Sequence, residues 1–217
     1  MKYKNLFFDL DDTIWAFSQN ARDTFEEVYQ KYSYERYFDS FDHFYAIYQK
    51  RNTELWVEYG EGKITKDELN RQRFFYPLMS VGVEDEALAE QFSKDFFSII
   101  PTKRGLMPYA KEVLEYLAPK YNLYILSNGF RELQSRKMRS AGVDGYFKKV
   151  ILSEDLGVLK PYPEIFNFAL SATQSELRSW NASGFLQCDG ADYFPFSSYL
   201  PHPLFEGIND FAIGLLV

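Results

Sequence analysis

The sequence predicts an α/β fold in which a parallel β-sheet core is interrupted by a helical insert. Three apolar segments indicate strands that are buried on both faces, because their hydrophobic residues are continuous rather than alternating; these are residues 5–9, 123–126 and 150–152. A helical pattern over about 131–141 separates the second and third strands, and the order strand, helix, strand is typical of a parallel sheet with right-handed crossovers. Residues 16–100, in contrast, show several amphipathic helices and no convincing strand.

The helices expected around the sheet have recognisable ends. A helix over 109–117 precedes the second strand and is ended by Pro119. Gly142 is the expected stop of the helix at about 131–141, and another helix is expected at 164–170. The apolar face expected for the helix before Gly142 consists of Leu133, Met138 and Ala141.

The insert is predicted to be a small helical bundle. Nineteen of its residues are aromatic, which suggests either stacking on a nucleobase or packing of the bundle itself. Because many of them recur at helical spacing, packing is the favoured interpretation. Thr65 and Glu68 fit a capping box at the start of one helix, and Pro101 and Gly105 mark the return to the core. The capped helix begins ahead of Leu69, and the apolar residues of the other three helices are Phe25/Val28/Tyr29/Tyr32, Phe44/Ile47/Tyr48 with Leu55/Trp56, and Phe92/Phe96/Phe97.

Composition and charge narrow the possible partners. The 217 residues carry a net charge of −7 without a dense Lys/Arg block, which argues against a nucleic-acid partner. The apolar segment at residues 6–8 is too short for a signal-peptide core, and no run is long enough for a membrane span. Cys188 is the single cysteine, so no intramolecular disulfide can form. We therefore expect a cytoplasmic protein with no membrane partner.

Acidic residues crowd the end of the first strand. Asp9 and Asp11 stand two residues apart, so they point the same way if the extended conformation persists. Ligands of open parallel sheets bind beyond the carboxyl ends of the strands, and two adjacent acids need a cation or a division of roles to offset their repulsion. The alternative interpretation is a polar turn in which Asp12 or Thr13 caps a helix.

Two further segments favour a functional site. The second strand ends in Ser127 and Asn128, and Lys160 lies in a loop after the third strand. In isolation Ser127 would be a turn former and Lys160 a solvated charge. Together with the acids, they place a carboxylate pair, a hydroxyl and a cation at one edge of the sheet. That combination predicts an anion-binding site beside a nucleophile.

With these motifs the chain resembles the haloacid dehalogenase superfamily, in its branch with a helical cap after the first motif. The motifs are Phe7-Phe8-Asp9-Leu10-Asp11-Asp12-Thr13, the strand-end Ser127, and Lys160 in Gly-Val-Leu-Lys-Pro. The resemblance covers about residues 1–178 and implies a Rossmann-like core at 1–15 and 101–178 with a cap at 16–100.

The resemblance also implies roles for the site residues. Asp9 would attack phosphorus and form an aspartyl-phosphate, while Asp11 would act as general acid and then as general base. The Asp9 carboxylate and the Asp11 carbonyl would bind Mg²⁺. Ser127 and Lys160 would contact the phosphoryl group, and Thr13 and Asn128 are assigned to the same phosphate-binding set.

The same resemblance narrows the reaction without fixing the substrate. Dehalogenases of this superfamily lack the second aspartate, because halide leaves without a proton, so Asp11 favours a phosphatase over a 2-haloacid dehalogenase. A phosphomutase is not distinguished from a phosphatase. The segment from Asp12 to Ala21 resembles the nucleotide-phosphatase branch. The expected substrate is therefore a small phosphomonoester, with a nucleoside monophosphate as the first choice.

Residues 179–217 depart from the family pattern. The expected fourth motif, a strand followed by Gly-Asp that supplies further Mg²⁺ ligands, is not recognisable, and all 24 Lys and Arg lie in residues 1–178. One interpretation is a tail of unrelated origin, such as a frameshifted coding end, which would leave a catalytically impaired remnant. The other is a diverged site in which Asp189 and Asp192 replace the missing acids. The first is favoured, because Asp-x-x-Asp is a weak pattern.

Overall fold

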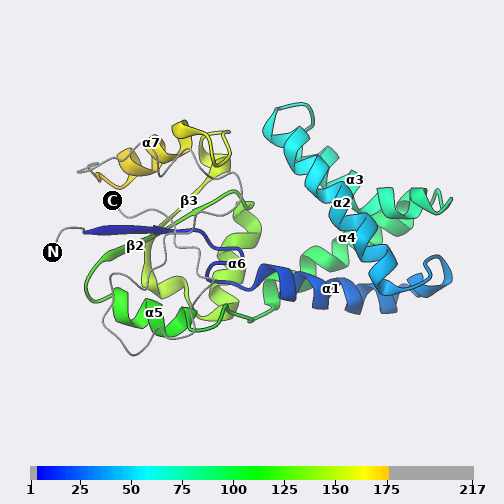
Figure 1. Ribbon diagram of the computed structural model, residues 1–217, viewed down its shortest axis with the longest axis horizontal. Helices are drawn as coiled ribbons and strands as arrows, with labels where there is room; N and C mark the ends of the chain where they lie inside the picture. The colour runs from blue at the N-terminus through cyan, green and yellow to red at the C-terminus, as the bar shows by residue number, and fades with distance from the viewer. Residues whose placement is uncertain (1–3, 176–217) are drawn as a thin grey trace. The chain divides into compact units, whose positions relative to one another are not determined.

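The computed structural model describes residues 4–175, which form two compact units (Figure 1). One unit combines residues 4–17 with 104–175, and the other is the insert, Ser18–Lys103. The insert therefore begins and ends within a few residues of the predicted 16–100. The predicted tail at 179–217 lies outside the described residues.

A parallel sheet forms the centre of the α/β unit. Within residues 4–175 its strands are β1 (Asn5–Phe8), β2 (Asn122–Ser127) and β3 (Phe147–Leu152), in the order β1-β2-β3. Phe8 pairs with Ile125 and Ser127 with Leu152. All three predicted strands are confirmed. β3 starts three residues before the predicted strand. The apolar pattern does not include this part because Lys148 and Lys149 are exposed.

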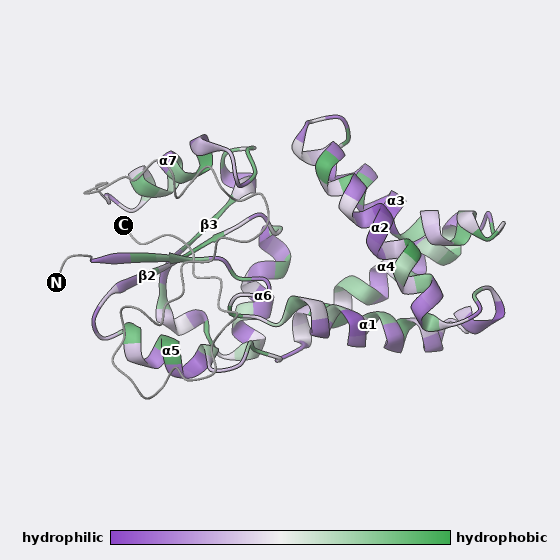
Figure 2. Cartoon of the chain, in the orientation of Figure 1, coloured by the Kyte–Doolittle hydropathy of each residue, from purple (hydrophilic) through white to green (hydrophobic). Residues whose placement is uncertain are grey.

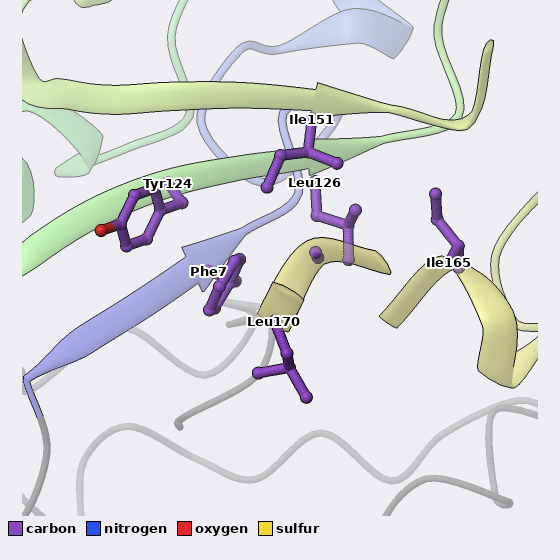
Figure 3. Close-up of a cluster of buried hydrophobic side chains, with 7 residues drawn as sticks. Phe7, Tyr124, Leu126, Ile151, Ile165 and Leu170 are labelled. Carbon is purple, nitrogen blue, oxygen red and sulfur yellow. The ribbon is translucent and has the colours of Figure 1, made fainter. Parts of the chain in front are cut away.

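Helices cover both faces of this sheet. They are α5 (Ala110–Leu117), α6 (Arg131–Ala141) and α7 (Pro163–Ala172), and α7 lies on the opposite side of the strands from α5 (Figure 1). Ile165 and Leu170 of α7 pack with Phe7 of β1 and with side chains of β2 and β3 in one buried cluster (Figure 3). Within residues 4–175, four 3-10 helices connect the elements, at Tyr34–Arg36, Ile100–Thr102, Asp144–Tyr146 and Ser153–Asp155.

One helix differs from its prediction in the face that it buries. α6 ends at Gly142 as expected, with φ 69° in the left-handed region that glycine tolerates. Its buried residues, however, are Gln134, Lys137 and Met138, whereas Leu133 and Ala141 are only half-buried. The buried face of α6 therefore includes two polar side chains, because Gln134 and Lys137 form hydrogen bonds with residues at the end of the sheet.

Four helices form the insert, and each carries both hydrophobic and hydrophilic residues (Figure 2). They are α1 (Phe17–Lys31), α2 (Phe41–Gly60), α3 (Lys66–Ser80) and α4 (Glu86–Ile99). The capping box is confirmed: the Glu68 amide donates to the Thr65 hydroxyl at 3.2 Å, and the Thr65 amide donates to the Glu68 carboxylate at 2.7 Å. Ser40 and Asp85 cap α2 and α4 through their side-chain oxygens. Along the described helices, no segment is both long and apolar enough to cross a membrane.

Aromatic side chains make the core of the insert. Phe25 is fully buried, and its ring centroid lies 4.2 Å from that of Tyr48 and 4.3 Å from that of Phe96. Phe44 and Phe92 are buried around it, in tilted or edge-on ring contacts that aromatic pairs prefer. These contacts support packing as the role of these five aromatic residues.

Replacing Phe25 by Ala is expected to lower the free energy of unfolding by about 3–5 kcal/mol, because it empties the centre of this cluster. Met79→Ala removes a side chain that is 48% exposed and is expected to change it by less than about 0.5 kcal/mol. Urea unfolding followed by circular dichroism measures both. Equal effects would contradict a central role for Phe25.

Candidate active site

A tight turn follows β1 and carries the acidic motif. The amides of Ile14 and Trp15 both donate to the Leu10 carbonyl, at 3.0 and 2.9 Å, and the Asp12 amide donates to the Trp15 carbonyl. Asp12 adopts φ 55°, a left-handed conformation that aspartate tolerates better than most residues. The Thr13 side chain is buried within this turn. The turn places Asp9 and Asp11 beyond the end of the strand, as the sequence predicts.

Lys160 pairs with Asp9 across the end of the sheet. Its Nζ lies 2.7 Å from Asp9 Oδ1 and donates to the Leu126 carbonyl at 2.9 Å. The Asp9 side chain is 35% exposed, so the pair is open to solvent on one side. An ammonium in this position offsets negative charge on Asp9 and on any anion that approaches it.

Asn128 holds the backbone of Lys160. The Lys160 amide donates to Asn128 Oδ1 at 2.8 Å, and Asn128 Nδ2 donates to the Lys160 carbonyl at 3.1 Å. Both polar atoms of the Asn128 side chain are thus engaged by one residue. This geometry orients the lysine loop and supports a positioning role for Asn128.

Ser127 is buried, with its hydroxyl acting as an acceptor. It accepts hydrogen bonds from the Gly129 amide at 3.1 Å and from Gln134 Nε2 at 2.8 Å. With both acceptor positions filled, the hydroxyl proton of Ser127 is directed away from these partners and can be donated to an anion.

Two residues that the sequence interpretation missed contact the second aspartate. Lys137 Nζ lies 2.8 Å from Asp11 Oδ1, and Gln134 Nε2 lies 2.8 Å from Asp11 Oδ2. The signal was present in the sequence: a Gln and a Lys three positions apart, with Met138, on the face of a helix next to the strand-end Ser127. Apolar spacing does not reveal this face of α6, because two of its three buried side chains are polar.

The oxygen atoms at this edge of the sheet are suitable ligands for a hard cation, but they are few within residues 4–175. The Asp9 carboxylate is half-exposed, and the Asp11 carbonyl accepts no backbone hydrogen bond from residues 4–175. Oxygen ligands of this kind are the ones that Mg²⁺ prefers. Among the described residues, however, no group of three Asp, Glu, His or Cys side chains could hold a metal ion. Asp189 and Asp192, the acids of the alternative interpretation, lie outside those residues.

Comparison with known proteins identifies the family to which this fold and site belong. The model of the haloacid dehalogenase-like hydrolase family matches residues 3–178, which include Asp9, Ser127 and Lys160. This chain belongs to the haloacid dehalogenase-like hydrolases. The family relationship predicted from the three motifs is therefore confirmed, and the protein is a member of an enzyme family.

Two curated relatives in this hydrolase family come from bacteria. The chain is 32% identical over 168 residues to the putative HAD-hydrolase YfnB of Bacillus subtilis, covering 77% of this chain and 68% of the relative. It is 31% identical over 180 residues to the pyrimidine 5′-nucleotidase YjjG of Escherichia coli, covering 82% and 75%. The match to YjjG, which is named a 5′-nucleotidase, supports the nucleotidase-like branch predicted from the sequence.

Solved structures show the same hydrolase fold. The crystal structure of YfnB bound to magnesium superposes with a TM-score of 0.70 at 27% identity, covering 79% of this chain and 74% of that one. An L-2-haloacid dehalogenase from Xanthobacter autotrophicus superposes with a TM-score of 0.61 at 20% identity, covering 80% and 66%. At that identity, the dehalogenase supports the fold alone.

Replacing Asn128 by Ala is expected to lower the free energy of unfolding by about 1–3 kcal/mol, because two partly buried backbone groups of Lys160 lose their partners. The control is Asn122→Ala, which removes an exposed amide bonded to Asn5 and is expected to cost less than about 0.5 kcal/mol. Thermal unfolding measures both changes. An Asn128 effect as small as the control would contradict the clamp on the lysine loop.

Proposed function

We propose that the protein is a phosphatase that hydrolyses small phosphomonoesters through a phosphorylated aspartate. The observation that carries this proposal is the convergence of Asp9, Lys160 and Ser127 at one edge of the sheet, with Asp11 two residues from the nucleophile. A carboxylate, a cation that offsets charge and a free hydroxyl donor are the groups that phosphoryl transfer to a side chain needs.

The proposed reaction assigns a step to each of these groups. An Asp9 oxygen forms a bond to phosphorus while the bond to the leaving oxygen breaks, and Asp11 gives that oxygen a proton. Water then attacks the phosphoryl group, its proton passes to Asp11, and the Asp9 carboxylate is released with inorganic phosphate. Lys160 offsets the negative charge gathered between Asp9 and the phosphoryl oxygens, and Ser127 donates a hydrogen bond to one of them.

A divalent cation completes this proposal. Mg²⁺ would be held by the Asp9 carboxylate and the Asp11 carbonyl, and it would neutralise phosphate charge when bound. The magnesium-bound structure of YfnB supports this choice of ion. In the favoured form of the proposal, residues 179–217 add no further ligand. In the alternative form, Asp189 and Asp192 supply further ligands.

Nucleoside monophosphates are the proposed substrate class. YjjG and the Streptococcus pneumoniae relative PynA, 30% identical over 164 residues, are both named pyrimidine 5′-nucleotidases. Asp11 supports a leaving group that needs a proton, which an alkoxide does and a halide does not. Pyrimidine 5′-monophosphates are therefore the first substrates to test, with 2-chloropropionate as the comparison.

Asp9→Asn is expected to abolish phosphate release in the presence of Mg²⁺, because an amide is not a nucleophile. Asp144→Asn is a matched control on an exposed residue of the same unit and should retain the activity of the parent. Release of inorganic phosphate from a panel of nucleoside monophosphates measures this. Parent-like activity of Asp9→Asn would contradict the covalent mechanism, and chloride release from 2-chloropropionate instead of phosphate release would favour a dehalogenase.

Calorimetric Mg²⁺ titration tests the metal ligands. The parent is expected to bind Mg²⁺ weakly, because residues 4–175 provide acids from only one side, and Asp9→Asn should weaken binding by more than about tenfold. Asp189→Asn and Asp192→Asn should leave the affinity unchanged. Tight binding by the parent that is lost in either variant would instead show that these acids complete the site.

A further inference from the structure

Helix α6 presents two hydrogen-bond donors to the carboxylate of Asp11. Gln134 and Lys137 stand three positions apart, a spacing that places them on the same face of the helix. Lys137 contacts Asp11 Oδ1 and Gln134 contacts Asp11 Oδ2, each at 2.8 Å. Each carboxylate oxygen thus has its own donor. The Asp11 side chain is fixed in both position and plane.

Lys137 is almost completely buried where it contacts Asp11. Its side chain is only 4% exposed, and its Nζ lies 4.7 Å from the ring centroid of Trp15 and 5.0 Å from that of Phe17. Within residues 4–175, Asp11 is the carboxylate that forms its ion pair. A buried ion pair rarely adds stability over apolar side chains of similar size, so a lysine at this position points to function.

Gln134 connects Asp11 to the phosphate side of the site. Its Nε2 donates to Ser127 Oγ as well as to Asp11, and the whole side chain is buried. Gly129 provides the space that Gln134 occupies, because a Cβ at position 129 would lie 2.1 Å from Gln134 Nε2. The backbone of Gly129 does not need glycine for its conformation, since its φ lies outside the left-handed region. The close approach of Gln134 therefore explains why this position is occupied by glycine.

We propose that Gln134 and Lys137 are positioning residues that hold the Asp11 carboxylate in place for proton transfer, with Gly129 as the space that this arrangement requires. The inference rests on the proposed phosphatase function, in which Asp11 gives a proton to the leaving oxygen and later takes one from water. A carboxylate offers about four lone-pair positions, so two donors leave positions for that proton. Both residues act through their contacts with the Asp11 carboxylate.

A comparison of two leaving groups separates positioning from a merely structural role. Nitrophenolate leaves without a proton, whereas the alkoxide of a nucleoside 5′-monophosphate needs one. In Lys137→Met, kcat/KM for the nucleotide is expected to fall by about tenfold or more, while kcat/KM for p-nitrophenyl phosphate stays within about threefold of the parent. Because water activation also suffers, p-nitrophenyl phosphate should show a burst of nitrophenol followed by slow turnover.

Matched variants extend this test to the rest of the arrangement. Gly129→Ala is expected to reproduce the loss of nucleotide activity by displacing Gln134. Gly145→Ala is its control, because a Cβ at position 145 would meet nothing within 4 Å and φ there is ordinary. Lys111→Met, at an exposed position of α5, is the control for Lys137→Met. In both controls, the ratio of kcat/KM for the nucleotide to kcat/KM for p-nitrophenyl phosphate should equal that of the parent.

Thermal unfolding provides a readout that does not depend on turnover. Asp11→Asn alone leaves the Lys137 ammonium buried without its counter-charge, so its Tm should fall by about 5 °C or more. Adding Lys137→Met to Asp11→Asn should recover part of the lost Tm. The same Lys137→Met change in the parent should raise Tm less, or lower it. Independent effects of the two changes would overturn the ion pair on which the proposal depends.

The outcomes distinguish this inference from the proposed function. A parent that releases no phosphate from either substrate overturns the phosphatase and, with it, the role given to the pair. Turnover by the parent, with equal losses of kcat/KM for both substrates in Lys137→Met, overturns the positioning role alone. A selective loss on the nucleotide, together with coupled Tm values, supports it.

Discussion

Parallel pairing of β1 with β2, and of β2 with β3, is the constraint on which the site depends. Strands that run in the same direction end at the same edge of a sheet, so residues that are distant in sequence meet there. Asp9 follows β1, Ser127 ends β2, and Lys160 follows β3. The pairing of Phe8 with Ile125 and of Ser127 with Leu152 brings these strand ends together. Packing of α7 on the sheet through Ile165 and Leu170 supports that register (Figure 3).

Charge at this edge is balanced by two separate cations. Asp9 pairs with Lys160, and Asp11 pairs with Lys137, at 2.7 and 2.8 Å. Two carboxylates two residues apart would otherwise repel each other, and each lysine reduces that cost at one of them. The two pairs differ in burial: Lys160 is 22% exposed, whereas Lys137 is 4% exposed. The open pair suits a group that meets an incoming anion, and the closed pair suits a group that holds its partner in place.

Aromatic residues in the insert illustrate how the same composition supports two explanations. Phe25, Phe44 and Phe92 all lie in the bundle core, so their number reflects packing. Large rings bury much apolar area, which helps these four helices to form a compact unit. The burial of these three residues therefore gives no support for nucleobase stacking by them.

The sequence by itself determined the elements of the fold and the residues of its motifs. Continuous apolar runs before Asp9 and Ser127 are short and bounded by polar residues, which is enough to predict buried parallel strands, and Thr65 with Glu68 is enough to predict a helix start. Only the tertiary structure decided the partners: Asn128 on the backbone of Lys160, and α6 turned so that Gln134 and Lys137 meet Asp11. The physical reason is that periodicity reports apolar burial, whereas these polar side chains are stabilised by specific partners that are distant in sequence. Asp11 is more than a hundred residues from Gln134 and Lys137, and Asn128 is 32 residues from Lys160.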